Sequence, residues 1–320
     1  MWVTANRASR VLYNFLISLE KPICFLVPAN VCPIVLATFI KAKVPYRLLD
    51  IDRKTLCIDL KFVERSLRQS KDDLGLLFVR TFGYTQHQES NLDTLKATHE
   101  NLAVIVDDRC LDIPQIDATA FSESIDMTLF STGYSKYVEL GYGGYGWLSK
   151  AQAARYVSPD ITYDEVEHEK LVSDFNDAIQ SKDKFIYRYD NWLDNRVLPH
   201  SLEEYFQLIN KKSVETKDRK ARNNAIYRQK IKPELWLGEE FDNWRFSILV
   251  SNKTQLIDSI FSKGDFASSH YASLAGIFDT TQAPVADMIH SQIVNLFNDF
   301  RCDEAMAKRV AKIVKSEAIT

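Results

Sequence analysis

The chain has 320 residues, of which 46% are hydrophobic and 26% are charged, and this composition excludes disordered, collagen-like and coiled-coil proteins. The length predicts two domains with a substantial buried core. A formal net charge of −3 gives no electrostatic basis for binding nucleic acid or an anionic membrane surface, so we expect neither as a partner.

From the N-terminus onward, short apolar runs alternate with longer amphipathic ones. The segment 22–42 is apolar over a length that would suit a membrane span, but Pro22, Pro28 and Pro33 interrupt it, so we expect a buried strand and a buried helix there and no membrane span. The predicted helices are 8–19, 31–42, 60–68 and 91–99, and the predicted strands are 22–27, 44–51, 74–80, 102–106, 127–131 and 145–149. This alternation indicates an α/β fold, with a mostly parallel sheet covered by helices on both faces.

The last third of the chain has a different pattern. Residues 163–184 are charged and predict a helix or a partly exposed segment. Residues 201–230 predict one long helix or a helix pair that bridges to a second domain. A strand at 244–251, a helix at 254–262 and a closing helix at 303–315 follow. We therefore expect a large domain over 1–205 and a smaller α+β domain over 206–320.

Polar residues gather where predicted strands end. Asp107 and Asp108 follow one strand, Ser131 ends the next, and Lys136 lies in a turn that contains Gly133. Five of the ten glycines fall between Gly133 and Gly146. This enrichment indicates a backbone conformation or a close approach in this segment that a Cβ atom would hinder. Because function in open α/β sheets gathers at the carboxyl ends of the strands, we expect these side chains to lie close together.

A lysine, a carboxylate and a helix N-terminus on one surface suit pyridoxal 5'-phosphate (PLP). This cofactor attaches to a lysine amine, needs an acid beside its ring nitrogen, and needs N–H groups and hydroxyls for its phosphate. The residues 4–7, which precede the first predicted helix, would supply that N-terminus. The residue types alone leave open the alternative that Lys136 is an ordinary surface lysine.

The order of several motifs resembles the DegT/StrS sugar aminotransferases, a family of fold type I PLP enzymes. Ala5-Asn6-Arg7-Ala8-Ser9 resembles the family's phosphate turn, and Val27 to Pro33 resembles its Pro-Ala-Tyr-Thr-Cys-Pro variant. Further similarities, over about 145 residues, are Val44 to Asp52, Phe82-Gly83, Ile105 to Asp108, Asp126, Phe130-Ser131, Lys136 and Gly141 to Trp147. Ser269-His270-Tyr271 and Ile293 to Leu296 resemble landmarks of the family's small domain more loosely.

The resemblance implies a three-layer PLP-binding large domain, a smaller C-terminal domain and a homodimer with its sites at the subunit interface. It implies that Lys136 binds PLP covalently and shuttles a proton, and that Asp108 faces the pyridine nitrogen. Ser131 would bind the phosphate together with the backbone near Ala5 and Asn6. It also implies a nucleotide-linked keto sugar as substrate and an amino acid as amino donor, for surface polysaccharide or secondary-metabolite synthesis. The other residues that it places at the cofactor are Arg7, Cys32 and Cys110.

The sequence also departs from the family around the cofactor. The chain begins almost at the phosphate turn, whereas the family has several dozen residues before it, and Asn6 replaces the glycine of that turn. Leu111 replaces a residue that would bond the cofactor's 3-oxygen, and Arg109 is expected to bring charge near the ring pocket unless it points away. Cys32 stands where many members have a stacking aromatic ring. The family's Asn-x-Arg motif, which reaches the dimer mate, appears only in shifted form at 194–196.

Two interpretations follow from these departures. The first is a diverged sugar aminotransferase, which the retention of Lys136, Asp108 and Ser131 favours. The second is a relative with impaired PLP catalysis that serves as a binding or partner subunit.

A few other residues are candidates for the substrate cleft. Arg80 could reach a substrate phosphate from a strand end. Other residues that could line the cleft are Tyr84, His87, Glu139, His270 and Tyr271. The histidines lack the spacing of metal ligands, so we expect no metal site. The five cysteines are scattered and form no CxxC pair, which argues against a disulfide framework and favours a reducing, cytoplasmic location. There is no GxSxG, Walker A or Rossmann GxGxxG motif in the expected place.

Overall fold

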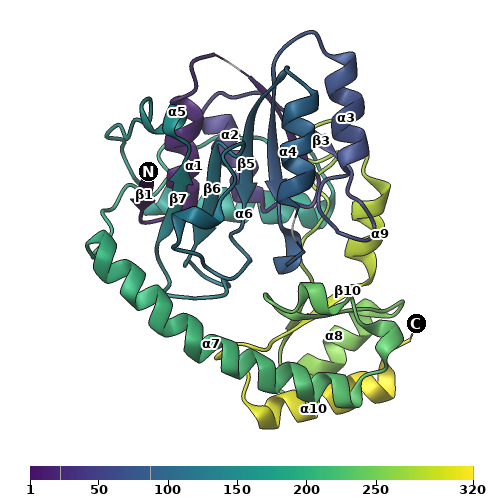
Figure 1. Cartoon of the computed structure of the whole chain (residues 1–320). Coiled ribbons are helices and arrows are strands. Elements are labelled where there is room, and N and C mark those ends of the chain that lie inside the picture. Colours follow the sequence, from purple (N-terminus) through teal and green to yellow (C-terminus); the bar gives the residue numbers. More distant parts are fainter. Residues whose placement is uncertain (22, 87, 320) are drawn as a thin grey trace.

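The computed structural model describes residues 1–21, 23–86 and 88–319 (Figure 1). Its main feature is a seven-stranded sheet with the strand order β1-β7-β6-β5-β4-β2-β3. The strands are β1 (Trp2–Ala5), β2 (Cys24–Pro28), β3 (Tyr46–Leu49), β4 (Leu74–Val79), β5 (Leu102–Asp108), β6 (Met127–Ser131) and β7 (Gly144–Leu148). Only β7 runs against its neighbours in this sheet, which confirms the mostly parallel arrangement that the sequence predicts.

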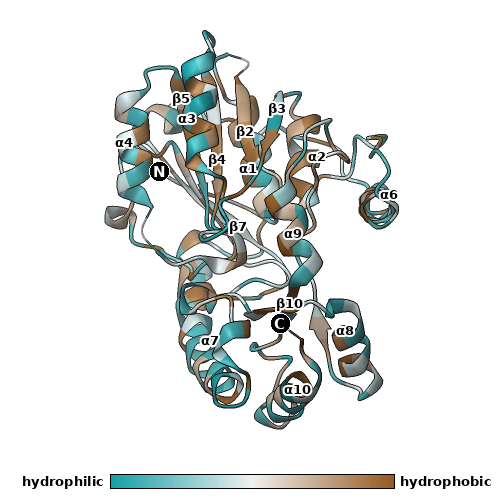
Figure 2. Cartoon of the chain, turned by 90° about the vertical axis from the view of Figure 1, so that its right-hand side faces the viewer, coloured by the Kyte–Doolittle hydropathy of each residue, from teal (hydrophilic) through white to brown (hydrophobic). Residues whose placement is uncertain are grey.

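Helices cover both faces of the sheet. On one face α1 (Ala8–Ile17) and α2 (Pro33–Lys41) pack on Val104 and Val106 of β5. On the other face α3 (Leu60–Gln69) and α4 (Glu89–Thr98) pack on Ile105. Successive strand residues point to opposite faces, so a strand buried on both faces is apolar throughout, as the brown colour of β2 in Figure 2 shows. This confirms the three-layer α/β fold.

The C-terminal part has its own three-stranded antiparallel sheet, ordered β8-β10-β9. It contains β8 (Phe246–Leu249), α8 (Lys253–Ser262), β9 (Ala267–Ser268), β10 (Ile293–Leu296) and α10 (Glu304–Glu317). On α10, Met306, Val310 and Val314 are buried in this smaller core, and the amphipathic pattern of the sequence predicts that face.

One long helix, α7 (Leu202–Lys230), joins the two parts (Figure 1). Its first half buries Tyr205 and Ile209 beside the large sheet, and its second half buries Tyr227 in the small core. The expected boundary between residues 205 and 206 therefore falls inside a continuous helix and stays a prediction. Moreover, α9 (Pro284–Gln292) returns to the large sheet, where its Ala286 and Ile289 join the core that α3 and α4 cover.

Most predicted elements are present within a few residues of their expected ends. The helix expected at 163–184 is α6 (Glu165–Ser181), and a short helix, α5 (Lys150–Ala153), follows β7. The sequence did not predict β1, β9, β10 or α9, and β9, with two residues, is too short to give a periodic signal. Pro22, which opens the first predicted strand, and His87 lie outside the described residues. Within the described part of the chain, no helix combines the length and the apolar character that crossing a membrane requires.

Candidate active site

A cavity of about 300 Å³ lies at the carboxyl ends of β5 and β6. Its volume is at the lower end of the usual range for small-molecule sites. The structure brings six of the predicted residues together in its lining: Arg7, Cys32, Asp108, Cys110, Ser131 and Lys136. Ala5 and Asn6 lie in the segment just before α1 and do not line it. The cavity is also lined by Ala8, Ser9, Leu12, Ile34, Val35, Leu129, Gly133, Tyr134, His168, Trp192 and Asp194.

Asp108 is the last residue of β5 and is buried. It shares the sheet face of Val104 and Val106, which is the face that α1 and α2 cover, and it therefore points toward the cavity. Its Oδ1 accepts a hydrogen bond of 2.9 Å from the Cys110 N–H. Burial raises the pKa of the Asp108 carboxyl above its ordinary value, although the Cys110 bond and the positive charge of Lys136 act in the opposite direction.

Lys136 lies in the turn after β6 and also lines the cavity. Burial alone would lower the pKa of its amine, but Tyr271, Cys110, Cys32 and Asp108 outweigh that effect and raise the pKa. The raised pKa keeps the Lys136 amine protonated at neutral pH. Tyr271 interacts with Lys136, so one of the predicted substrate residues is near the amine.

The N-terminus of α1 also lines the cavity. Arg7 is its N-cap residue and makes no side-chain cap bond, and the N–H groups of Ala8 and Ser9 in the first turn have no acceptor within the helix. These N–H groups and the helix dipole favour an anion. The Ser131 hydroxyl, which accepts a 3.2 Å bond from the Gly133 N–H, lines the same cavity.

A glycine brings this helix end close to the sheet. A Cβ atom on Gly144 of β7 would lie 2.2 Å from the Ala8 N atom, so no other residue fits at this position without a shift of the backbone. This close approach accounts for part of the glycine enrichment between residues 133 and 146. Asn6 does not adopt a positive φ, so the turn before α1 does not need the glycine that Asn6 replaces.

Asp194 lines the cavity although the sequence did not indicate it as a site residue. Its Oδ2 accepts bonds of 2.7 Å from both Asn6 Nδ2 and Arg196 Nη2, and it lies 3.4 Å from Arg7 Nε. Burial would raise the pKa of Asp194, but the bonds from Arg196 and Asn6 lower it, so it is ionised. The shifted motif at 194–196 is the signal in the sequence, and in the structure its Asp194 lines the cavity beside Arg7 of the same chain. Ser9, His168 and Trp192 gave no signal.

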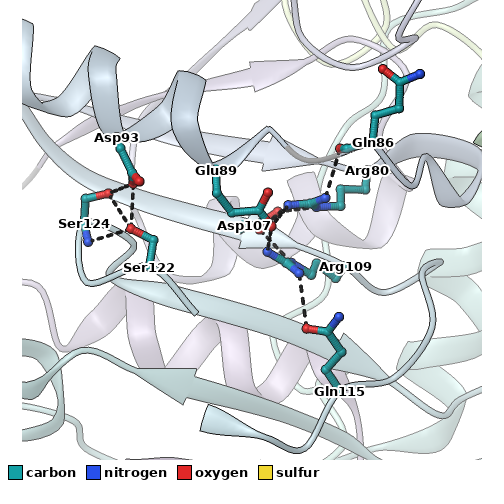
Figure 3. Close-up of polar contacts among 9 residues, drawn as sticks. All are labelled: Arg80, Gln86, Glu89, Asp93, Asp107, Arg109, Gln115, Ser122 and Ser124. Atoms are coloured by element: carbon teal, nitrogen blue, oxygen red, sulfur yellow. Dashed lines mark hydrogen bonds and ion pairs between the residues drawn. The ribbon is translucent and has the colours of Figure 1, made fainter. Parts of the chain in front are cut away.

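Two predicted residues, Arg80 and Arg109, lie on the other side of the sheet and not in the cavity. Figure 3 shows both guanidinium groups around Asp107, which shares the sheet face of Ile105. Arg80 Nε and Nη2 contact the Asp107 carboxylate at 3.1 and 3.0 Å, and Arg109 Nε contacts it at 2.7 Å. Glu89 Oε1 accepts from both arginines, at 2.9 and 2.6 Å. The expectations that Arg109 brings charge to the ring pocket and that Arg80 reaches a substrate are thus not met in this structure, because the two arginines are held by Asp107 and Glu89.

This four-residue network predicts a pH-dependent stability. Burial would raise the pKa of Glu89, but Arg80 and Arg109 lower it to about 2 from the ordinary 4.5. A carboxyl with a lowered pKa stabilises the fold fully above its unfolded value and loses that contribution as the pH falls toward the folded value. We therefore expect the free energy of unfolding to decrease between about pH 4.5 and pH 2, by roughly 1–3 kcal/mol. Urea titrations across this range check it, and a Glu89→Gln variant with an equally steep profile would contradict the assignment to Glu89.

The remaining predicted residues lie outside the cavity lining. Tyr84 is buried and its hydroxyl contacts Gln86 Oε1 at 3.1 Å. Leu111 is buried in the core that α3 and α4 cover. The rings of His270 and Tyr271 pack on Trp244, and their centroids lie 5.6 and 5.8 Å from the centroid of the Trp244 ring.

The side chains of the cavity fit PLP at three of its polar positions. Lys136 offers the amine, Asp108 offers a carboxylate for the ring nitrogen, and the N-terminus of α1 with Ser131 offers donors for the phosphate. The fourth polar position of PLP is its 3-oxygen. Leu111 replaces the residue that would bond this oxygen, and its side chain offers no polar partner.

Comparisons with known proteins agree with the fold. Neither the models of protein families nor the curated proteins include a match to this chain. Among solved structures, a DegT DnrJ EryC1 StrS aminotransferase from Brucella abortus is 13% identical, with a TM-score of 0.64 over 98% of this chain and 85% of that chain. The sugar aminotransferase CalS13 from Micromonospora echinospora is 16% identical, with a TM-score of 0.67 over 98% and 87%. The E. coli GDP-4-keto-6-deoxy-D-mannose-3-dehydratase with bound hydrated PLP is 15% identical, with a TM-score of 0.65 over 98% and 87%.

At these identities the likeness shows the fold. The chain has the fold of the DegT/StrS-type enzymes, as the resemblance of its motifs implied. The same fold is used by an aminotransferase and by a dehydratase among these structures, so the reaction has to be argued from the residues of the site.

Proposed function

We propose that this chain, which has the DegT/StrS-type fold, is a PLP-dependent aminotransferase that transfers an amino group from an amino acid to a nucleotide-linked keto sugar. The observation that carries the proposal is that Lys136 and Asp108 line one cavity together with residues 7–9 at the N-terminus of α1. When bound, PLP would supply an electron sink for the negative charge that develops on the donor's α-carbon.

The chain's own residues would do the remaining work. Lys136 Nζ would take the proton from the α-carbon of the donor, because a free amine held at contact distance is an efficient base. The Asp108 carboxylate would keep the ring nitrogen protonated. The N–H groups of Ala8 and Ser9 and the Ser131 hydroxyl would orient the phosphate, while Leu12, Ile34 and Val35 would exclude water from the ring.

A second cavity shares Lys136 with the first. It has a volume of about 340 Å³ and reaches Lys136 from the side of α7. Its lining holds the cations Lys212 and Arg219 of α7 but also the carboxylates Glu139, Glu215 and Asp299, and Lys212 pairs with Glu215 at 2.8 Å. The nucleotide link of the substrate is therefore proposed by analogy with the fold and not from the charge of this cavity. A homodimer in the cytoplasm and a role in surface polysaccharide or secondary-metabolite synthesis belong to the same proposal, by analogy with the fold.

The test is an absorbance spectrum of the purified protein with added PLP, recorded before and after borohydride. We expect a yellow band that borohydride abolishes, and we expect Lys136→Ala to lack this band, because the cofactor's aldehyde carbon then has no amine to attach to. Lys150→Ala, which removes an exposed lysine of α5, is the matched control and keeps the band.

Amino transfer is then tested by adding glutamate to the yellow protein, which should bleach the band in a single turnover. If the wild-type chain gives no band, or if Lys136→Ala gives the same band, the proposal is wrong. The fold would then serve binding to a partner subunit, and co-purification with a longer homologue would be the next observation to seek.

A further inference from the structure

The turn that carries Lys136 is held by the C-terminal part of the chain. We propose that Trp244 is a positioning residue, which fixes the direction of the Lys136 amine by binding the preceding residue, Ser135, and that Arg245 and Arg301 assist it. The proposal rests on the proposed function of Lys136, and it adds that docking of the small sheet sets the geometry of this amine.

Ser135 has a backbone conformation that is unfavourable for its residue type. Its φ is +58°, in the left-handed region where a side chain with a Cβ atom is disfavoured. Such residues persist where the surroundings fix them, and they cluster at functional sites. The surroundings of Ser135 therefore have to supply that constraint.

Every polar group of Ser135 has a partner. Its N–H donates to Glu139 Oε2 at 2.6 Å, and its carbonyl accepts from Trp244 Nε1 at 2.6 Å. Its hydroxyl lies 3.3 Å from Arg245 Nη2, which donates to it. The first bond is within the turn, whereas the other two come from residues more than 100 positions later in the sequence.

The bond from Trp244 is the important one for Lys136. The Ser135 carbonyl and the Lys136 N–H belong to the same peptide unit, which is planar. Holding this carbonyl therefore fixes the plane from which the Lys136 side chain starts. A rotation of the plane would move the amine away from Asp108 and Tyr271.

The positioning residues are themselves firmly placed. Trp244 is 3% exposed, and its carbonyl accepts a bond from Lys220 of α7. The Arg245 guanidinium lies between the rings of Trp244 and Phe297, at 4.6 and 3.9 Å from their centroids. Arg301 binds Glu139, the residue that holds the Ser135 N–H, and also contacts Asp299 at 3.0 Å.

A close approach at the neighbouring turn shows the same tight docking. A Cβ atom on Gly83, which has a φ of +77°, would lie 2.9 Å from the Trp244 N atom. Glycine is thus needed where the Phe82-Gly83 turn meets the backbone of Trp244.

The test compares Trp244→Phe with Trp236→Phe. Trp244→Phe keeps an aromatic ring and removes the N–H that holds the Ser135 carbonyl. Trp236→Phe is the matched control, since its Nε1 also donates to a carbonyl, that of Ile231 at 3.2 Å, but lies elsewhere in the small domain. Arg301→Gln is a second variant for the case that Trp244→Phe does not fold. The Arg301 side chain is 30% exposed, so its replacement disturbs the core less.

The first readout needs no cofactor. Acetic anhydride acetylates the unprotonated Lys136 amine. Mass spectrometry measures the fraction of Lys136 that is acetylated at each pH, which gives a pH profile. We expect Trp244→Phe to shift the midpoint of this profile relative to wild type and Arg301→Gln to shift it in the same direction, because the amine changes its distance to Asp108, Cys32, Cys110 and Tyr271. Trp236→Phe should leave the profile unchanged.

The second readout is the single-turnover bleaching by glutamate, which Trp244→Phe should slow by about 10–100-fold, since a misplacement of about 1 Å costs on the order of 10²-fold. Equal profiles and equal rates for Trp244→Phe and Trp236→Phe would overturn the inference. If wild type forms no PLP band, the proposed function fails, and the acetylation profile still decides whether Trp244 positions Lys136.

Discussion

Asp108→Asn is expected to slow the transfer of the amino group from glutamate by about 10²–10³-fold, the cost of removing one preorganised electrostatic partner. The buried Asp108 carboxylate lies in the cavity with Lys136 and is fixed by the Cys110 N–H. Asparagine keeps the size and the hydrogen bond but loses the negative charge that would hold a proton on the ring nitrogen. The rate of bleaching after rapid mixing with glutamate measures the effect.

The absorbance band should survive in Asp108→Asn, because Lys136 is intact. Asp108→Glu should recover part of the rate, since it restores the charge. The control is Asp126→Asn, which alters a carboxylate at the amino end of β6 that pairs with Lys96 at 3.1 Å, and it should stay within a few-fold of wild type. A full rate in Asp108→Asn would remove Asp108 from the proposed site.

Asp107→Asn is expected to lower the free energy of unfolding by about 3–5 kcal/mol, the usual cost of removing one partner from a buried ion pair. Arg80 is 1% and Arg109 4% exposed, and both guanidinium groups contact the Asp107 carboxylate. The variant leaves two buried cations with Glu89 as their remaining carboxylate in the network of Figure 3. Urea denaturation at pH 7 measures the loss.

Asp265→Asn is the matched control for this prediction. Asp265 is also buried and pairs with one arginine, Arg309, but that side chain is 56% exposed, so water can solvate the cation after the change. We expect a smaller loss than for Asp107→Asn. Equal losses in the two variants would show that burial of the arginines does not determine the cost.

The sequence by itself determined six of the seven strands of the large sheet, all but β1, and the helices α1 to α4 that cover it. The apolar runs that became β4 and β5 and the amphipathic pattern of α3 are local signals, which depend on residues a few positions apart. The cluster of Asp108, Ser131 and Lys136 could also be predicted, because parallel strands place their carboxyl ends at one edge of the sheet. The ordered motifs added the expected roles, which stay predictions.

The tertiary structure alone decided what surrounds that cluster. Arg109 follows the end of β5, so the alternation of the strand did not settle its direction, and the buried carboxylates of Asp107 and Glu89 draw it away from the cavity. Asp194 reaches Asn6 across 188 positions, and Trp244 reaches Ser135 across 109. Contacts of this range leave no period in the sequence, because they depend on how the chain packs after its helices and strands have formed, and this packing determines how firmly Lys136 is held.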